Sequence, residues 1–275
     1  MNIPSIKLLS LDLDGTVVYD NKYVSDTDKN AIIKAVKAGV YVTIATGRMY
    51  YSAKKWADEF LANAPLITCN GSRIRDEKKV YYSSGINLSK LKELYETFDD
   101  MQVRRYCFGR DAIFCTGEGV DESFFTKNNT YKNEGPFIKV FESKQKLFDE
   151  IGDDTNKFLV IMKDDQDHKK ALKRAAEITG FESVVGDLHN IEFTNSGVTK
   201  AAGLKRLADM LDVDISQTMA IGDSENDIEI IKAAGLGVAV GNAMENVKAV
   251  ADKVVAPMKE NGTAQAIEKF IFKNI

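Results

Sequence analysis

The mainly apolar run from Ile6 to Leu11 ends in the acidic segment Asp12-Leu13-Asp14-Gly15-Thr16. Such a run is typical of a strand that is buried on both faces of a parallel sheet, and open parallel sheets place their ligands at the carboxyl ends of the strands. Two aspartates this close repel each other unless a cation lies between them. With a cation, one carboxylate can attack an electrophile while the other handles a proton. The segment therefore predicts metal-assisted phosphoryl transfer to an aspartate within an α/β fold.

A calcium-binding loop of the EF-hand type is excluded by the spacing of this segment. Counting from Asp12, position 6 is Val17 and position 12 is Tyr23, where such loops require glycine and glutamate. The second acidic cluster, Gly222 to Asp227, fails the same test. A match of five residues is also compatible with an ordinary turn, so other segments have to support the interpretation.

The composition places the chain among ordinary globular proteins. Its 275 residues can bury two moderate cores, and its net charge of -4 offers no attraction to nucleic acid or to anionic membranes. The segment before Asp12 matches neither a secretory signal nor a membrane span, so we expect a cytoplasmic protein. Three cysteines without a CxxC pair are expected to be reduced, and two scattered histidines are too few for a zinc site.

The first third of the chain alternates between apolar runs and amphipathic stretches, as in a parallel sheet with crossover helices. Helices are expected at 25–38 and 51–61, and strands at 6–11, 40–45 and 66–69. A turn at Asn70-Gly71 then opens a hairpin whose arms are expected at 72–75 and 80–83.

Between Ser84 and Asn195 the pattern changes to amphipathic helices and short strands. Helices are expected at 88–98, 144–151 and 166–179, and strands at 102–108, 112–115, 136–141, 157–162, 181–185 and 191–194. The parallel rhythm then resumes, with helices at 200–211, 224–234, 243–250 and 263–272 and strands at 218–221 and 237–240. The expected fold class is therefore α/β, with a Rossmann-like parallel-sheet core (residues 1–83 and 196–275), helices on both of its faces, and an inserted α+β cap domain (residues 84–195).

Four polar segments are expected to meet at one edge of the core sheet. They are Asp12 to Thr16, Thr46-Gly47-Arg48, Lys200 at the start of a helix, and Gly222 to Asp227. Each has an ordinary explanation on its own, such as a turn, a solvated lysine or a capped helix. Phosphoryl transfer needs a nucleophile, an acid/base, a hydroxyl with backbone amides, a fixed cation and carboxylates for Mg²⁺. The four segments supply each of these once, so Mg²⁺ is the expected cofactor.

At these residues the chain resembles the haloacid dehalogenase superfamily, and within it the Cof-type hydrolases, which carry a large α/β (type C2) cap between the second and third motifs. The resemblance covers nearly the whole length. It rests on Asp12-Leu13-Asp14-Gly15-Thr16, Ala45-Thr46-Gly47-Arg48, Asn70-Gly71, Gly197-Val198-Thr199-Lys200, Gly222-Asp223-Ser224-Glu225-Asn226-Asp227, Gly241-Asn242-Ala243-Met244 and Asn261-Gly262. One departure is Ala201, where the family usually has glycine; alanine favours a helix, so Lys200 keeps its expected role.

The resemblance implies that Asp12 attacks phosphorus and becomes an aspartyl-phosphate. Asp14 would protonate the leaving oxygen and then activate the water that hydrolyses the intermediate. Thr46 and the amide of Gly47 would hold phosphoryl oxygens, and Lys200 would neutralise the phosphate and the surroundings of the nucleophile.

The resemblance also implies a Mg²⁺ site formed by the Asp12 carboxylate, the Asp14 backbone carbonyl and Asp223. Asp227 would lie nearby, through water or through Lys200, and Asn226 is expected as a further phosphate contact.

No motif identifies the residues that select the substrate. The candidates for substrate binding are Arg48, Asn70, Gly71 and His189, joined by the cap arginines Arg104, Arg105 and Arg110. Each cap arginine also has an ordinary interpretation as a solvated strand or turn residue.

The implied function is a Mg²⁺-dependent phosphatase for small phosphorylated metabolites, with sugar phosphates as the default class for this type of cap. The presence of Asp14 favours phosphate esters over dehalogenation, because only a leaving oxygen needs a proton. A phosphomutase that protects its intermediate from water is a second interpretation, and a non-catalytic regulator that binds a phosphometabolite is a third. Hexose phosphates, pyridoxal phosphate and flavin mononucleotide stay open as substrates, as does the choice between monomer and dimer.

The insert is also expected to act as a mobile lid. Its two connections, near Ser83 to Gly85 and Thr194 to Gly197, are rich in serine and glycine, which can absorb the dihedral changes of a hinge. Closure would exclude water and present cap side chains to the leaving group. Specificity is therefore expected in the cap and chemistry in the core.

Overall fold

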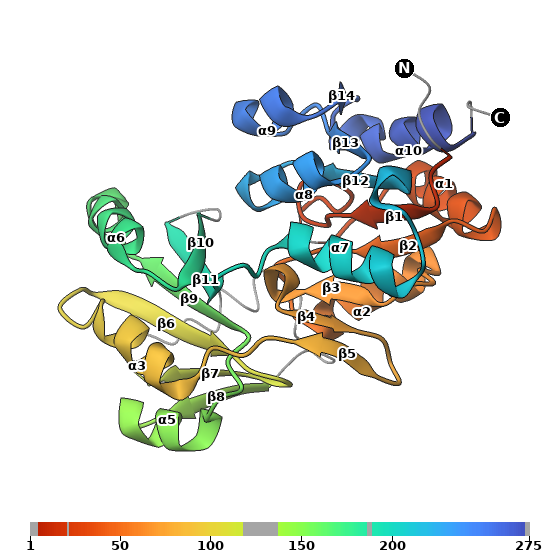
Figure 1. Ribbon diagram of the computed structural model, residues 1–275. Coiled ribbons are helices and arrows are strands. Elements are labelled where there is room, and N and C mark those ends of the chain that lie inside the picture. Colours follow the sequence, from red (N-terminus) through yellow and green to blue (C-terminus); the bar gives the residue numbers. More distant parts are fainter. Residues whose placement is uncertain (1–4, 21, 118–136, 186–188, 273–275) are drawn as a thin grey trace.

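The computed structural model describes residues 5–20, 22–117, 137–185 and 189–272. Within these ranges the chain forms two parts, each built around its own sheet, and the middle of the sequence forms the second part (Figure 1). Pro136, the first residue expected in one of the cap strands, lies outside the described residues. No helix in the described ranges combines the length and the apolar character that a membrane crossing requires.

The core sheet is parallel and has the order β14-β13-β12-β1-β2. Its strands are β1 (Leu8–Leu11), β2 (Tyr41–Ile44), β12 (Thr218–Gly222), β13 (Leu236–Ala239) and β14 (Lys253–Val254). The chain adds β2 on one side of β1 and β12 on the other. The strand order therefore reverses at β1 and β12, whose carboxyl ends flank the crevice where open sheets of this type bind ligands.

Helices cover both faces of the core sheet, because its strands are apolar on both sides. Leu9 and Leu11 of β1 pack in one apolar cluster with Ile32, whereas Leu8 packs in another cluster with Leu204. The helices around this sheet are α1 (Asp26–Lys37), α2 (Tyr50–Phe60), α7 (Lys200–Met210), α8 (Ile228–Ala233), α9 (Glu245–Val250) and α10 (Gly262–Ile267). The predicted α/β class with a parallel-sheet core is thus confirmed.

A three-stranded antiparallel sheet of β3 (Leu66–Thr68), β4 (Arg73–Arg75) and β5 (Val80–Ser83) extends the core. A parallel bridge between Ala45 and Ile67 joins it to the end of β2. The 3₁₀ helix η1 (Cys69–Gly71) makes the turn between β3 and β4 that Asn70-Gly71 predicted.

The middle of the chain forms a six-stranded sheet of order β10-β11-β9-β6-β7-β8, called the cap sheet below. Its strands are β6 (Val103–Phe108), β7 (Ala112–Thr116), β8 (Phe137–Phe141), β9 (Lys157–Met162), β10 (Phe181–Val185) and β11 (Asn190–Asn195). Neighbours pair antiparallel except β7 and β8, which are parallel. One face packs against α3 (Leu88–Glu96), α5 (Lys144–Ile151) and α6 (Asp165–Glu177).

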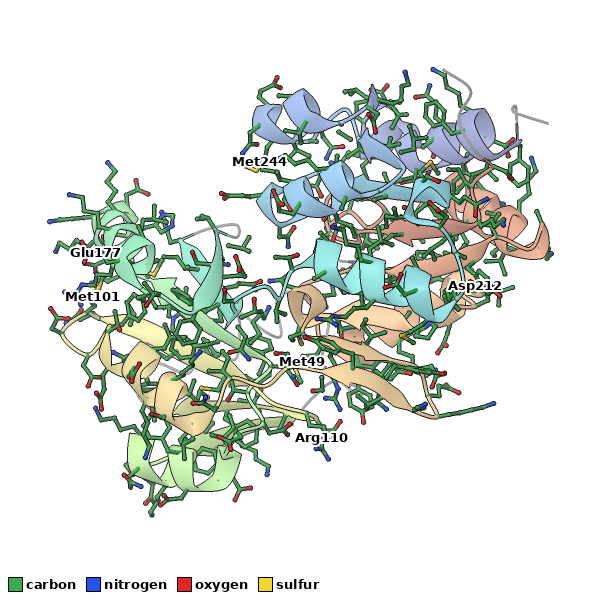
Figure 2. All side chains as sticks on the ribbon, viewed as in Figure 1. Met49, Met101, Arg110, Glu177, Asp212 and Met244 are labelled. Carbon is green, nitrogen blue, oxygen red and sulfur yellow. The ribbon has the colours of Figure 1, made fainter. Side chains whose placement is uncertain are left out.

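The other face of the cap sheet meets the core. Leu159 and Ile161 of β9 share an apolar cluster with Met49 and Cys69, which belong to the core segments after β2 and β3. Figure 2 places Met49 between the two parts of the molecule. Cys69 and the other two cysteines are free and buried, in agreement with the expected reduced state.

The structure differs from the predicted elements at the end of the chain. The helix expected at 224–234 is split into the 3₁₀ helix η3 (Glu225–Asp227) and α8, and the last helix continues from α10 into a wider turn, Glu268–Phe272. The strand β14 was not predicted, because it has only two residues and both are exposed, so it carries no apolar pattern.

Candidate active site

Asp12 lies directly after β1 and is held by the neighbouring strand. Its backbone N–H donates to the carbonyl oxygen of Ile221 (3.0 Å), which continues the pairing of β1 with β12. The side chain is buried, and its Oδ1 accepts a hydrogen bond from Lys200 Nζ at 2.7 Å. The carboxylate therefore has a defined position at the crevice between the two strands.

Lys200 begins α7, where the hydroxyl of Thr199 caps the helix. Only 1% of the lysine side chain is exposed. Its ammonium donates to Asp12 Oδ1 (2.7 Å), Asp227 Oδ1 (2.8 Å) and Asn226 Oδ1 (3.1 Å). Burial by itself would lower the pKa of Lys200, but the two carboxylates outweigh burial and raise that pKa above its usual value. Lys200 is therefore a permanent cation within the site.

Three carboxylates gather around this cation. Oxygens of Asp12, Asp223 and Asp227 lie within 4.8 Å of one another. Burial raises the pKa of Asp12 well above its usual range; Lys200 opposes this rise, and the carboxylates of Asp227 and Asp223 add to it. Because one lysine cannot balance three carboxylates, the cluster favours a further cation. Carboxylate oxygens are the ligands that suit a hard divalent ion such as Mg²⁺, so the residues present fit this metal.

The two aspartates of the Asp223 loop (Asp223 to Asp227) have different surroundings. Asp223 Oδ1 accepts from the hydroxyl of Thr16 (2.8 Å). In Asp227, Oδ1 accepts from Lys200 (2.8 Å), and Oδ2 accepts from the backbone N–H groups of Asp223 (3.1 Å) and Ser224 (3.2 Å). Both oxygens of Asp227 therefore accept from protein donors, and these contacts hold the loop and the lysine. Binding of the metal by Asp223 stays a prediction.

The side chain of Asp14 lies outside this cluster and faces the Thr46 loop (Thr46-Gly47-Arg48). Arg48 Nε donates to Asp14 Oδ2 (2.7 Å), and Arg48 Nη2 donates to Asp14 Oδ1. Such a two-point contact holds a carboxylate in one orientation. Arg48, predicted as a substrate contact, thus lies directly against the predicted acid/base.

Hydrogen bonds join the Thr46 loop to Asn70 and the lysine. The Thr46 hydroxyl accepts from the backbone N–H of Arg48 (3.1 Å), and the Thr46 carbonyl accepts from the backbone N–H of Asn70 (3.1 Å). The side-chain oxygen of Asn70 accepts from Asn226 Nδ2 (3.4 Å), and Asn226 Oδ1 accepts from Lys200. The structure therefore brings the predicted phosphate-binding residues together as one connected group beside the nucleophile.

Gly71 packs against the start of α7. Its φ is +95°, and a Cβ at this position would lie 2.1 Å from the carbonyl oxygen of Thr199. Only glycine permits this approach, which sets the position of Lys200 relative to η1. The contact observed for Gly71 is thus with the backbone of α7, and its contact with substrate stays a prediction.

The structure does not bring His189 to this group. His189 Nε2 lies 2.5 Å from Asp165 Oδ1, and its ring contacts His168, so both partners are on α6. His189 precedes β11, whose odd-numbered residues Ile191 and Phe193 face the helices, and it continues that alternation away from the core. Its placement therefore gives no support to the predicted substrate contact.

The side chains of Arg105 and Arg110 also bond within the cap. Arg105 donates to the carbonyl oxygen of Phe98, and Arg110 pairs with Asp154 at 3.8 Å. Arg110, with 65% of its side chain exposed, matches the interpretation as a solvated turn residue, whereas Arg105, with 14% exposed, is not solvated.

Sequence reasoning missed two charged residues that the cap brings to the Thr46 loop. Lys157 Nζ donates to the carbonyl oxygen of Gly47 (2.8 Å), and Glu192 Oε2 accepts from Asn70 Nδ2 (2.6 Å). A signal was present for Lys157, which opens a strand whose six residues are all buried. Glu192 follows the ordinary alternation of β11 and gave no such signal. A charge inside an otherwise buried strand usually has a partner.

Comparisons with known proteins agree with this geometry. A family model described as haloacid dehalogenase-like hydrolase matches residues 9–267. The chain is 32% identical over 268 residues to the 5-amino-6-(5-phospho-D-ribitylamino)uracil phosphatase YcsE of Bacillus subtilis, covering 97% of this chain and 96% of the relative. It is 26% identical over 277 residues to YitU, a phosphatase with the same description from the same organism, covering 96% and 97%.

Solved structures lead to the same family. A haloacid dehalogenase-like hydrolase from B. subtilis superposes with a TM-score of 0.86 at 26% identity, covering 96% of this chain and 99% of that one. A sugar phosphatase of haloacid dehalogenase subclass IIB superposes with a TM-score of 0.83 at 25% identity, covering 98% and 100%. The chain therefore belongs to the haloacid dehalogenase-like hydrolases and is an enzyme of the phosphatase type.

Proposed function

We propose that this enzyme is a Mg²⁺-dependent phosphatase that hydrolyses small phosphorylated metabolites through an aspartyl-phosphate on Asp12. One observation carries the proposal: the buried Asp12 carboxylate shares Lys200 with Asp227, at a strand end that also presents Asp223. Mg²⁺, held by Asp12, Asp223 and the backbone carbonyl of Asp14, would supply positive charge for the phosphoryl group. A buried nucleophile beside a fixed cation is suited to attack on a phosphate ester.

The residues around Asp12 have different roles in the proposed reaction. An Asp12 oxygen attacks phosphorus, and the bond to the leaving oxygen breaks as Asp14 gives that oxygen a proton. Asp14, then ionised, takes a proton from the water that attacks the aspartyl-phosphate and releases inorganic phosphate. Lys200 and the backbone amide of Gly47 neutralise charge on the phosphoryl oxygens. Both oxygens of Asp14 accept from Arg48, so one of these contacts opens before Asp14 gives its proton to the leaving group.

The substrates we propose are phosphate monoesters of sugars or of sugar-like polyol chains. Two relatives are named for a phosphoribitylamino-uracil and one solved neighbour is called a sugar phosphatase, so a polyhydroxylated carbon chain next to the phosphate is common to them. We further propose that residues 84–195 act as a cap domain that selects among such esters, since the cap sheet turns one face toward the core at Met49 and Cys69.

The test is a panel of phosphate monoesters assayed for released inorganic phosphate with and without Mg²⁺. It should contain hexose phosphates, 5-amino-6-(5-phospho-D-ribitylamino)uracil, pyridoxal phosphate and flavin mononucleotide. We expect Mg²⁺-dependent release of phosphate from at least one polyol ester. An isomerised phosphate ester in place of free phosphate would indicate a mutase instead.

Replacing Asp12 by asparagine gives the matching residue-level prediction. Asparagine keeps the size of the side chain but is no nucleophile, so turnover should fall by roughly three orders of magnitude or more. The melting temperature is the control, because loss of one buried carboxylate from a repelling cluster should not unfold the protein. Turnover near that of the wild type would remove Asp12 from the role of nucleophile.

A further inference from the structure

Lys157 and Glu192 form a buried ion pair on neighbouring strands of the cap sheet. β9 and β11 pair with Glu192 opposite Leu159, and Lys157 Nζ lies 2.5 Å from Glu192 Oε1. The side chains are only 4% and 16% exposed. Removing two charges from water costs about as much as their attraction returns, so a buried pair does not by itself account for stability. The pair calls for another explanation.

Both members of the pair also form hydrogen bonds with core residues. Lys157 Nζ donates to the carbonyl oxygen of Gly47 (2.8 Å), and Glu192 Oε2 accepts from Asn70 Nδ2 (2.6 Å). A Cβ at Gly47 would lie 3.2 Å from Glu192 Oε2 and 3.0 Å from Asn70 Oδ1. The cap carboxylate therefore lies against the backbone of the Thr46 loop itself, and glycine leaves the room for it.

The contact with Gly47 controls the orientation of one peptide group. The unit between Gly47 and Arg48 is planar and trans, so its carbonyl oxygen and its N–H point in opposite directions. Lys157 holds the carbonyl oxygen from the cap side, and the Thr46 hydroxyl holds the N–H at 3.1 Å from the core side. Without Lys157 the carbonyl end of this peptide loses this hydrogen bond.

The contact with Asn70 leads on to the catalytic lysine. Asn70 Oδ1 accepts from Asn226 Nδ2 (3.4 Å), and Asn226 Oδ1 accepts from Lys200 Nζ (3.1 Å). An unbroken series of hydrogen bonds therefore runs from Glu192 of the cap to Lys200 beside Asp12. This network crosses from the cap to the core at the Thr46 loop and at Asn70.

We infer that Lys157 and Glu192 are positioning residues for the phosphoryl group: with the cap seated on the core, Lys157 orients the Gly47–Arg48 peptide, whose N–H positions the Thr46 hydroxyl. Glu192 orients Asn70, and the loop then binds phosphate tightly. The inference rests on the proposed phosphatase function. It differs from a role in substrate selection, because residues that act through the Thr46 loop affect every phosphate ester alike. It links closure of the cap to affinity for the group that all substrates share.

The test compares Lys157→Met, Glu192→Gln and the double variant with the matched control Lys139→Met. Lys139 forms another ion pair of the cap, with Glu150 at 2.7 Å, but both side chains are about half exposed (46% and 49%) and far from these contacts in the sheet order. The probe is inorganic phosphate in the presence of Mg²⁺, titrated by calorimetry. It carries no leaving group, so its affinity reports on the phosphate-binding residues and not on contacts with the rest of an ester. KM, kcat and the melting temperature are measured alongside, for two esters with different leaving groups.

Loss of a hydrogen bond from a charged donor should weaken phosphate binding roughly tenfold in Lys157→Met, with KM raised by a similar factor for both esters. The double variant should be little worse than either single one, because the two residues act as one unit. Lys157→Arg, which keeps the charge, should recover part of the affinity. Lys139→Met should bind phosphate like the wild type.

Unchanged phosphate affinity in Lys157→Met and in Glu192→Gln would overturn the inference, and Glu192→Gln decides alone if Lys157→Met does not fold. A KM that rises for one ester only would mean that the pair contacts the leaving group, which contradicts the inference. A lower melting temperature with unchanged KM and phosphate affinity would mean that the pair has a structural role, which also contradicts it. The proposed function fails separately, when the wild type releases phosphate from no ester although it binds inorganic phosphate. A wild type that does neither would overturn both.

Discussion

Single residues of the site are held by charge. Lys200 donates hydrogen bonds to Asp12, Asp227 and Asn226. The site has no net positive charge, because the three carboxylates of Asp12, Asp223 and Asp227 outnumber this lysine. The same arrangement raises the pKa of Asp12, first through burial and then through the neighbouring carboxylates. A second cation would balance the excess of carboxylates and lower the pKa of Asp12. Substitutions of single residues test whether the site binds such a cation.

Asp223→Asn should raise the Mg²⁺ concentration that gives half-maximal activity by roughly tenfold or more, because a charged oxygen ligand of a hard cation is lost. Asp223 also accepts from Thr16, and asparagine can keep that contact. Titration of Mg²⁺ against phosphate release measures the shift. Asp252→Asn is the control, because the Asp252 side chain accepts from the backbone N–H of Gly237 (2.8 Å) and is not part of the carboxylate cluster. An unaltered Mg²⁺ requirement in Asp223→Asn would exclude Asp223 from the metal site.

The raised pKa of Asp12 predicts how stability depends on pH and on the metal. Its pKa in the folded protein lies above that in the unfolded chain, so without metal its contribution to stability is present at low pH and is lost as the pH rises through the folded-state pKa. Mg²⁺ binds the ionised carboxylates and should reverse this loss. Thermal melting with Mg²⁺ or with a chelator should show a larger stabilisation by Mg²⁺ at about pH 8 than at about pH 5. Equal shifts at both pH values would contradict it.

At the level of elements, the site depends on how closely a turn approaches a helix. η1 lies against the first turn of α7, where Gly71 leaves no room for a side chain beside the carbonyl oxygen of Thr199. The turn carries Asn70 and the helix begins with Lys200, so one backbone contact sets the distance between two parts of the site. The β1–β12 pairing does the same for Asp12 and Asp223.

Gly71→Ala should therefore disturb catalysis as well as stability. Its φ of +95° disfavours alanine, and the added Cβ at 2.1 Å from Thr199 would push α7 away. We expect a loss of roughly 1–3 kcal/mol in the free energy of unfolding and a lower kcat, because Lys200 moves with the helix. Gly39→Ala is a matched control, with φ +87° but no atom within 4 Å of the added Cβ. If both variants lose equal stability and keep kcat, the close approach does not position Lys200.

At the level of the whole molecule, two neighbouring crossings connect the parts. Asn195 Nδ2 donates to the carbonyl oxygen of Gly85 (2.7 Å) and to Ser84 Oγ (3.0 Å), so the outgoing and returning chains lie side by side. Asn156 Nδ2 adds a bond to Ser83 Oγ (3.1 Å). Two adjacent crossings allow the cap to swing as one body, which is the arrangement expected of a hinge.

The lid prediction follows from this connection. Binding of orthovanadate, a phosphate analogue, should compact the molecule in small-angle scattering, and exchange of residues 84–195 for those of a relative should change the preferred ester while Asp12 and Mg²⁺ stay essential. The control is Asp12→Asn carrying the exchanged cap, which should be inactive on every ester. An invariant scattering profile together with an unchanged order of substrates would contradict the lid.

The sequence predicted the elements well because their signals are local. Ser25 and Gly39 bound α1 as a side-chain cap and a left-handed glycine, and both act within one turn of their own position. β14 was not predicted, because its two exposed residues form no apolar pattern. The strand becomes visible only through its pairing with β13, which is a contact distant in sequence.

Site residues were predictable where chemistry requires a particular side chain at a strand end or helix start. Asp12, Asp223 and Lys200 meet in the structure because the carboxyl ends of β1 and β12 and the first turn of α7 meet at one edge. His189, predicted as a substrate contact, lies against Asp165 and His168 of α6, because the alternation of β11 turns it toward that helix. A shift of one residue along a strand moves a side chain to the opposite face of the sheet. The sequence around a single loop histidine does not show which face it will occupy.

The class of the fold and the identity of the motif residues could be predicted without the structure, because strand burial, helix capping and the spacing of carboxylates are local properties. Packing of the elements settled which charges meet. It placed Arg48 on Asp14, joined Asp227 to Lys200, and brought Lys157 and Glu192 of the cap onto the Thr46 loop. These pairs join residues separated by up to 122 positions, as between Asn70 and Glu192. Contacts over such separations form only when the sheets and helices pack, so no local pattern encodes them.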